Sequence, residues 1–134
     1  MDPFQHFVDA QSMVWANVQE ELSQGHKTSH WMWFVFPQLS GLGSSLLARQ
    51  YGIDDLAMAK AYQEHEILGP RLIEATKMVC KHQGKSLDAI FGNPDKLKFI
   101  SCMTLFAKAS GNKLFKKAIK AFDVKKDKLT LARI

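Results

Sequence analysis

The ten residues Thr28–Pro37, TSHWMWFVFP, decide how the fold of this chain is interpreted. Their aromatic and β-branched content is typical of a strand, although a short buried helix can carry the same residues. A strand needs a partner, and no second run of alternating apolar residues bounded by turn signals occurs in the chain. We therefore predict a short buried helix that is capped by Thr28 or Ser29 and ended by Pro37.

Helical signals surround this segment on both sides. Asp2 and Pro3 provide an N-cap and a first helical residue, and apolar residues then recur at helical spacing until Gly25. Asp54, Ser86 and Asn93 are expected N-caps further along the chain, as is Ser44 or Ser45. The expected helices cover residues 3–24, 28–37, 45–51, 55–66, 70–82, 87–91, 94–109, 113–122 and, with the weakest signal, 128–133. Together they predict an all-α fold, a single compact domain over residues 1–134 with seven or eight short helices.

Length and composition are consistent with one globular core. A chain of 134 residues buries about two-thirds of its unfolded surface, and 46% apolar residues are too many for a disordered chain. No apolar run is long enough to cross a bilayer.

The first residues show neither a secretory signal nor a lipidation motif, so we expect a cytoplasmic location. Cys80 and Cys102 lie in apolar helical stretches, which favours buried free thiols over a disulfide.

The net charge of +5 is divided unevenly along the chain. Residues 1–80 carry five Lys/Arg and nine Asp/Glu, whereas residues 81–134 carry thirteen and four. Four lysines recur at helical spacing opposite an apolar stripe, namely Lys113, Lys116, Lys117 and Lys120. Such a basic helix face can bind an acidic protein, nucleic acid or an anionic membrane, but a solvated face on a docked terminal helix is favoured. No base-reading fingerprint is present.

Polar side chains are interleaved with aromatic ones between Lys27 and Gln38. This mixture is typical of a pocket with apolar walls and a few polar groups. On the predicted helix, His30 would lie in the first turn, where free backbone N–H groups favour an anion that Lys27 could also bind. Trp31 or Trp33 could stack on a ring of the ligand. The alternative is that the aromatic residues are core and that His30 hydrogen-bonds a neighbour.

Two other patterns near this segment carry less information. His26 and His30 have the spacing of zinc ligands, but Gly25 breaks the helix between them and no third ligand is near. We therefore expect no metal site and no cofactor. The loop 41–45, GLGSS, resembles an anion-binding loop, yet it lacks the lysine and the spacing of a Walker loop, so a plain turn is favoured.

A second candidate cluster surrounds the turn between two predicted helices. Tyr62 and His65 share one helix face, and His65 is a possible general base. Arg71 is a permanently charged partner for a carboxylate or phosphate. Its simpler role is an internal ion pair, for example with Glu20 or Glu21. No Ser-His-Asp order, nucleophile elbow or paired-cysteine signature accompanies these residues.

The stretch Gly25–Ser44 resembles the hallmark segment of the domain of unknown function 1810 family. Further matches are Tyr51–Ile53, Ala61–Tyr62, His65, Leu68–Gly69, Arg71–Leu72, Ile90–Gly92, Asp95, Lys98, Ser101, Met103–Phe106, Asp127 and Thr130–Leu131. The resemblance implies a small all-helical domain, which supports a helix at Trp31–Phe36. It implies no catalytic role, because the family has no established activity. Cys102 and Glu66 replace the Ser and Pro of the pattern.

Our leading hypothesis places a pocket where Lys27–Gln38 meets Tyr51 and Tyr62–Arg71. The ligand would be small and anionic, with phosphate-bearing or nucleotide-like chemistry, and His30 or His65 would transfer a proton if the pocket is catalytic. The predicted ligand-binding residues are Lys27, His30, Trp31, Trp33, Gln38, Tyr51, Tyr62, His65 and Arg71. The alternative is a non-enzymatic interaction module that uses the basic C-terminal helix on an acidic protein, nucleic acid or membrane surface.

Overall fold

The computed structural model describes residues 2–134, which form nine α-helices and no strand. The helices are α1 (Gln5–Gln24), α2 (Met32–Val35), α3 (Leu46–Gln50), α4 (Leu56–Glu64), α5 (Leu68–Cys80), α6 (Leu87–Phe91), α7 (Asp95–Ala109), α8 (Leu114–Ala121) and α9 (Lys128–Arg133). The all-α prediction is confirmed. Residues 2–134 form nine helices against the expected total of seven or eight, and each of the nine helical segments expected from the sequence overlaps one of them, including the short helices α2, α3, α6 and α9.

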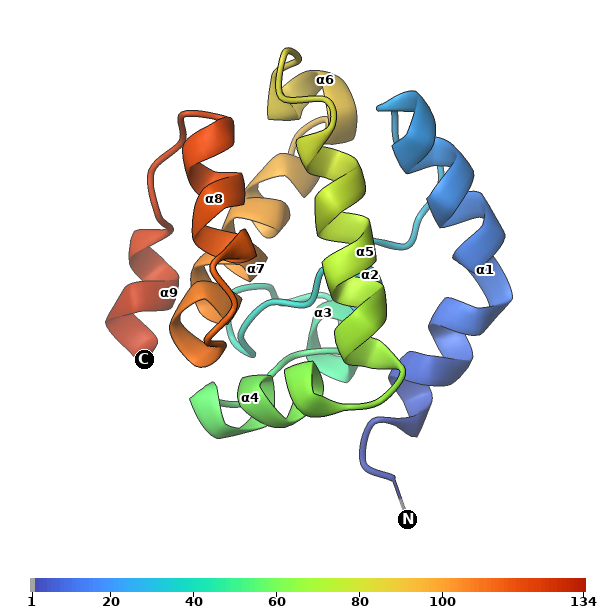
Figure 1. The fold of residues 1–134 in the computed structure, drawn as a ribbon. Coiled ribbons are helices and arrows are strands. Elements are labelled where there is room, and N and C mark those ends of the chain that lie inside the picture. The colour runs from blue at the N-terminus through green and yellow to red at the C-terminus, as the bar shows by residue number, and fades with distance from the viewer. Residues whose placement is uncertain (1) are drawn as a thin grey trace.

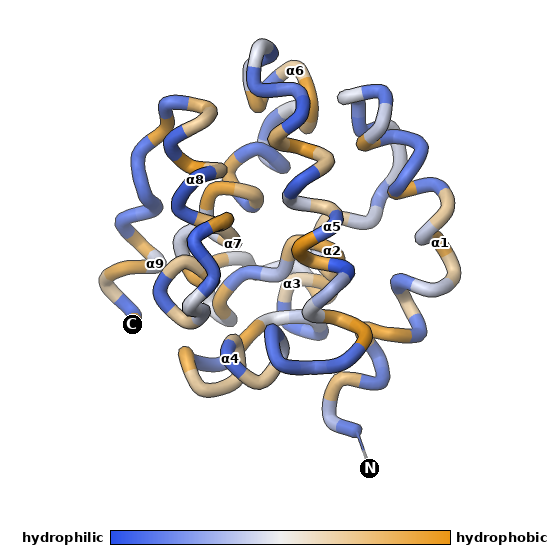
Figure 2. Tube along the Cα trace, viewed as in Figure 1, coloured by the Kyte–Doolittle hydropathy of each residue, from blue (hydrophilic) through white to orange (hydrophobic). Residues whose placement is uncertain are grey.

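Helix α7 forms the centre of the fold. The six consecutive residues Ser101–Phe106 are all buried, so α7 is covered around its whole circumference over this stretch. It contacts α2, α4, α6, α8 and α9. Helix α1 packs on α5 and α2, on the side of the molecule opposite to α8 and α9 (Figure 1). Hydrophobic residues of α5 and α7 lie toward the middle of the fold, whereas the connection between α8 and α9 is mostly hydrophilic (Figure 2).

The helix ends test the expected capping residues. Gly25 ends α1 in the left-handed conformation, with a φ of 68°, and Ser45 and Ser86 cap α3 and α6 as predicted. Asp55, rather than Asp54, caps α4 by accepting a hydrogen bond from the backbone N–H of Met58. The other two expected caps differ, because α1 begins at Gln5 and α7 begins at Asp95, and neither has a side-chain cap.

The aromatic segment is helical over a shorter stretch than expected. Thr28 and Ser29 do not cap α2, because Trp31 holds the N-cap position and the helix ends at Val35. A single parallel bridge between Leu39 and Ile53 follows, in which the Ile53 N–H donates to the carbonyl oxygen of Gln38 over 2.9 Å. The segment after Pro37 thus has one extended partner, although the pairing is too short to form a sheet.

The cysteines and the helix lengths add two further facts. Cys80 and Cys102 are free thiols, and burial raises the pKa of both above the ordinary value, most strongly for the fully buried Cys102. Among the nine helices of residues 2–134, none is long and apolar enough to span a membrane.

Close approach of α4 and α5 requires the glycine at position 69. A Cβ atom added to Gly69 would overlap with the carbonyl oxygen of Gln63, which is backbone and cannot rotate away. We expect Gly69→Ala to lower the free energy of unfolding by about 2–3 kcal/mol despite the better helix propensity of alanine. Urea denaturation measures this loss. Gly84→Ala is the control, because no atom lies within 4 Å of its added Cβ. Equal stability of the two variants would contradict the close approach.

Candidate functional site

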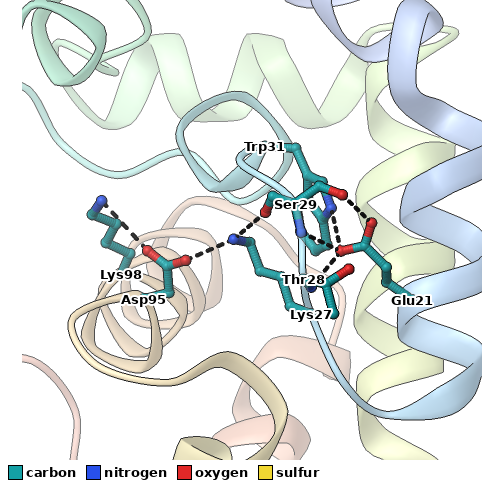
Figure 3. A network of polar contacts seen from close by, with 7 residues as sticks. All are labelled: Glu21, Lys27, Thr28, Ser29, Trp31, Asp95 and Lys98. Carbon is teal, nitrogen blue, oxygen red and sulfur yellow. Dashed lines mark hydrogen bonds and ion pairs between the residues drawn. The ribbon is translucent and has the colours of Figure 1, made fainter.

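The Glu21 carboxylate holds the start of the aromatic segment (Figure 3). Its Oε1 accepts hydrogen bonds from the backbone N–H groups of Thr28 and Ser29, over 2.7 and 2.8 Å, and from the indole Nε1 of Trp31 over 3.1 Å. Its Oε2 accepts from the Ser29 hydroxyl over 2.6 Å. One carboxylate thereby satisfies two backbone donors and a buried indole, and it turns the Trp31 ring into the core.

Hydrogen bonding keeps Glu21 ionised although the residue is buried. Burial by itself would raise the pKa of Glu21, but the hydrogen bonds from Ser29, Thr28 and Trp31 together lower it below the ordinary value of 4.5. The negative charge is therefore a fixed part of the folded structure at neutral pH.

A chain of alternating charges continues from this segment to α7 (Figure 3). The Nζ of Lys27 lies 2.8 Å from Oδ2 of Asp95, and the Nζ of Lys98 lies 3.5 Å from Oδ1 of the same carboxylate. The two lysines also lie over aromatic rings, Lys27 at 5.1 Å from the Trp31 ring centroid and Lys98 at 4.5 Å from that of Trp33. Asp95 is thus shared between two cations.

A cleft of about 260 Å³ opens beside Lys98, and we call it the Gln38–Lys98 cleft. Its walls come from the loop after α2, the first half of α7 and the start of α9. The lining residues are Gln38, Leu42, Gly43, Pro94, Leu97, Lys98, Ser101, Asp127 and Leu129. Most of the lining is apolar, with polar groups at a few points, as in small-molecule sites.

The polar groups of this cleft differ in whether they already make hydrogen bonds within the protein. Asp127 caps α9 by accepting from the Thr130 N–H over 2.9 Å, and the Ser101 hydroxyl donates to the carbonyl oxygen of Leu97. The Gln38 side chain makes no hydrogen bond within residues 2–134, while its backbone is fixed by the bridge to Ile53. The Gln38 amide and the Lys98 ammonium are therefore the groups best placed to meet a ligand.

The second predicted cluster is organised around Gln11, a buried polar residue of α1. Its Nε2 donates to the hydroxyl of Tyr62 over 3.0 Å and to the carbonyl oxygen of Phe34, while its Oε1 accepts from Arg71 over 3.4 Å. Burial raises the pKa of Tyr62 well above its ordinary value, so the hydroxyl stays neutral and accepts from Gln11. This network links α1, α4 and α5 through hydrogen bonds between their side chains.

Arg71 lies away from the carboxylates proposed as its partners. Its second guanidinium nitrogen reaches the hydroxyl of Ser12 over 3.3 Å, and the group stands 5.2 Å from the Trp15 ring centroid. The suggested ion pair with Glu20 or Glu21 is therefore wrong, because Glu21 faces the aromatic segment instead.

His65 is the C-cap residue of α4, and its ring contacts the start of α5. Its Nδ1 accepts hydrogen bonds from the backbone N–H groups of Ile67 and Leu68, so Nε2 carries the proton and lies 2.7 Å from Oδ2 of Asp2. That hydrogen bond lowers the pKa of the Asp2 carboxyl. Both ring nitrogens of His65 are thus engaged in joining the N-terminal segment to α5.

The structure brings the predicted ligand-binding residues into several separate groups. Lys27, Trp31 and Trp33 lie around Asp95 and Glu21, whereas Tyr62 and Arg71 meet at Gln11. Gln38 lines the cleft beside α7, and Tyr51 is buried under a stacked His6 ring at 5.5 Å. His30 is exposed in the bend before α2.

A polar hollow of about 280 Å³ includes Ser29, the residue that precedes the exposed His30 in the sequence. It is lined by Asn17, Glu20, Glu21, Gln24, His26, Thr28 and Ser29. Among the described residues that line this hollow, two are glutamates and none is a lysine or arginine. The hollow therefore does not suit the anionic ligand that we expected near His30.

Sequence reasoning missed Glu21, Gln11 and Asp95 as organising residues. Glu21 and Gln11 had a signal, since each is a polar residue on the apolar stripe of α1, where a buried side chain needs a partner. Asp95 had only a partial signal, because Lys98 follows it by three residues on the same helix whereas Lys27 comes from a distant part of the chain. Within residues 2–134, no three His, Cys, Asp or Glu side chains are grouped as metal ligands.

The predicted basic helix face corresponds to α8. Its apolar residues Phe115, Ala118 and Ile119 are buried, and the four lysines are exposed. The four lysines do not share one surface. Lys116 lines a cavity toward α7 and α9, whereas Lys117 lines a groove toward α5.

Comparison with known proteins places the chain in a family. The model of the protein family of unknown function DUF1810 matches residues 2–134. The chain belongs to the DUF1810 family. A similar solved structure is that of the conserved hypothetical protein Rv1873 from Mycobacterium tuberculosis, with 52% sequence identity and a TM-score of 0.94. The match covers 98% of this chain and 96% of that one. Among the curated proteins, none matches.

Removal of the Glu21 carboxylate is expected to destabilise this DUF1810 protein. At pH 7 we expect Glu21→Ala to lower the free energy of unfolding by about 3 kcal/mol, because three N–H donors lose their acceptor, one of them a buried indole. Urea denaturation followed by tryptophan fluorescence measures the loss. Glu20→Ala, the exposed neighbour on the same helix, should change stability by less than about 0.5 kcal/mol. A similar small change for both variants would contradict the assigned role.

The lowered pKa of Glu21 also predicts how stability depends on pH. A carboxyl whose pKa is depressed by folding stabilises the protein above the unfolded-state value of 4.5, and this contribution is lost as pH falls through the folded-state pKa. The stability difference between the unmodified protein and Glu21→Gln should therefore be constant above about pH 5.5 and shrink below about pH 4.5. A difference that is unchanged down to pH 3 would argue against an ionised Glu21.

Proposed function

We propose that the protein binds a small anionic ligand, with phosphate-bearing or nucleotide-like chemistry, in the Gln38–Lys98 cleft. The observation that carries this proposal is the placement of one incompletely neutralised lysine and one unengaged amide on the apolar walls of a concave site. An anion would pair with Lys98, the Gln38 amide would orient the ligand, and the leucines would cover its apolar part.

The charge on Lys98 is available because Asp95 is shared. Asp95 lies closer to Lys27 than to Lys98, at 2.8 against 3.5 Å, and the Lys27 side chain is only 6% exposed. Lys27 therefore neutralises most of the Asp95 charge without reaching the cleft. The Lys98 side chain is 20% exposed and lines the cleft, so the net positive charge of this trio is presented to a ligand there.

The apolar walls favour a ligand that has a flat or hydrocarbon part besides its anionic group. Leu97 and Leu129, which face the cleft from α7 and α9, are 54% and 64% exposed. Covering such side chains contributes about 25 cal/mol for each Å² removed from water. A nucleotide-like molecule combines both features, because its base is flat and its phosphate is charged.

This proposal keeps part of the site expected from sequence. Gln38 lines the cleft, and Trp33 and Lys27 support it through Lys98 and Asp95. Among the described residues that line it, none is a histidine. The proposal is accordingly one of binding, and the proton-transfer role considered for His30 or His65 is not part of it.

A thermal-shift screen with nucleotides and other phosphorylated metabolites tests the proposal. A ligand at 100 times its Kd stabilises the folded state by about 2.7 kcal/mol, which gives a clear rise in Tm for a chain of this size. We expect Lys98→Ala and Gln38→Ala to abolish the shift. Lys96→Ala is the matched control on the same helix, since Lys96 pairs with Asp88 and does not line the cleft.

Two results would overturn this assignment. One is the absence of a shift with every compound in the screen. The other is a ligand whose shift survives both Lys98→Ala and Gln38→Ala, which would locate binding elsewhere on the molecule.

A further inference from the structure

Three lysines from three different elements line one cavity, which shares no lining residue with the Gln38–Lys98 cleft. Lys108 lies in the last turn of α7, Lys116 in the first turn of α8, and Lys126 in the connection that precedes α9. The cavity has a volume of about 200 Å³, and its remaining lining residues are Thr104, Ala107 and Leu131.

No acidic side chain balances these three cations. Within the described residues 2–134, none of the three takes part in an ion pair, and no Asp or Glu lines the cavity. The nearest acid in sequence, Asp127, is turned toward α9, where its Oδ2 accepts from the Thr130 hydroxyl over 2.6 Å. Three like charges around one cavity repel one another, and a multivalent anion would relieve that repulsion.

The helix dipoles act differently on Lys108 and on Lys116. A cation in the last turn of a helix is favoured, which accounts for Lys108 without any ligand. Lys116 occupies the first turn of α8, where the dipole disfavours a cation and favours an anion. Its position is unfavourable for its own helix and becomes favourable when an anion lies between the helix start and the ammonium group.

We propose that this cavity binds an oligophosphate anion, a diphosphate or triphosphate group, through Lys108, Lys116 and Lys126. Each ammonium group offers three donors and acts as a point charge toward phosphate oxygens. The cavity is lined by α7, α8, α9 and the connection between α8 and α9, so it suits a compact cluster of phosphates better than an extended nucleic-acid backbone. This site is separate from the Gln38–Lys98 cleft, and the proposal does not depend on that cleft binding anything.

Isothermal titration calorimetry with inorganic triphosphate, at low salt and without divalent metal, tests the proposal on the full chain. We expect Lys108→Ala, Lys116→Ala and Lys126→Ala each to weaken the affinity about threefold to tenfold. Lys113→Ala and Lys120→Ala are matched controls, because both lysines are exposed, one at the N-cap and one in the last turn of α8, and neither lines the cavity. These controls should change the affinity by less than about twofold. Circular dichroism checks that every variant is folded, as expected for exposed side chains.

A second arm distinguishes this cavity from the general basic surface of α8. It uses a single-stranded oligonucleotide that carries no terminal triphosphate. Triphosphate binding that depends on the three cavity lysines, with weaker oligonucleotide binding, supports the proposal. Tighter oligonucleotide binding that depends equally on Lys113 and Lys120 would overturn it in favour of a nucleic-acid surface.

Two further results bear on the assignment. Failure of the unmodified protein to bind millimolar triphosphate would also overturn it. Lys98→Ala should leave triphosphate binding unchanged, so this result and the screen on the Gln38–Lys98 cleft can fail independently of each other. Loss of triphosphate binding in Lys98→Ala would place the anion in that cleft and contradict the proposal.

Discussion

The buried Glu21 carboxylate is the interaction on which the geometry of the aromatic segment depends. It collects the backbone N–H groups of Thr28 and Ser29 and the indole of Trp31, so that Trp31 is fully buried and His30 is left at the surface. This arrangement delays the start of α2 until Met32. It also places Lys27 against Asp95, which in turn sets the charge that Lys98 presents to its cleft.

Local signals predicted most of the fold. Gly25, Ser45 and Ser86 act within their own turns, so the sequence was sufficient to place the helix ends that they form. The start of α2 could not be predicted in this way, because Thr28 and Ser29 are good caps whose amides are bound instead by a side chain from the preceding helix. Asp54 and Asp55 are adjacent and chemically identical, and tertiary contacts distinguish them, because Asp54 accepts from the Ser40 hydroxyl while Asp55 caps α4.

The candidate site was harder to predict than the fold. Lys27 and Trp31 have the chemistry of ligand-binding residues, but composition does not reveal that each is satisfied inside the protein, by Asp95 and Glu21 respectively. Gln38 was selected for the same chemistry and does line a cleft. Helical spacing grouped Lys116 with the other lysines of α8, whereas tertiary packing brings it to Lys108 and Lys126, which precede and follow that helix.

Residues 2–24 contact the rest of the chain through pairs with very different sequence separations. The hydrogen bonds of Glu21 to Ser29 close a loop of only eight residues, whereas the contact between Asp2 and His65 closes one of 63. The entropic cost of closing the longer loop is higher by about 2 kcal/mol. The aromatic segment is therefore anchored by the shorter and less costly of these two closures, and its local geometry can form before Asp2 reaches His65 at the end of α4.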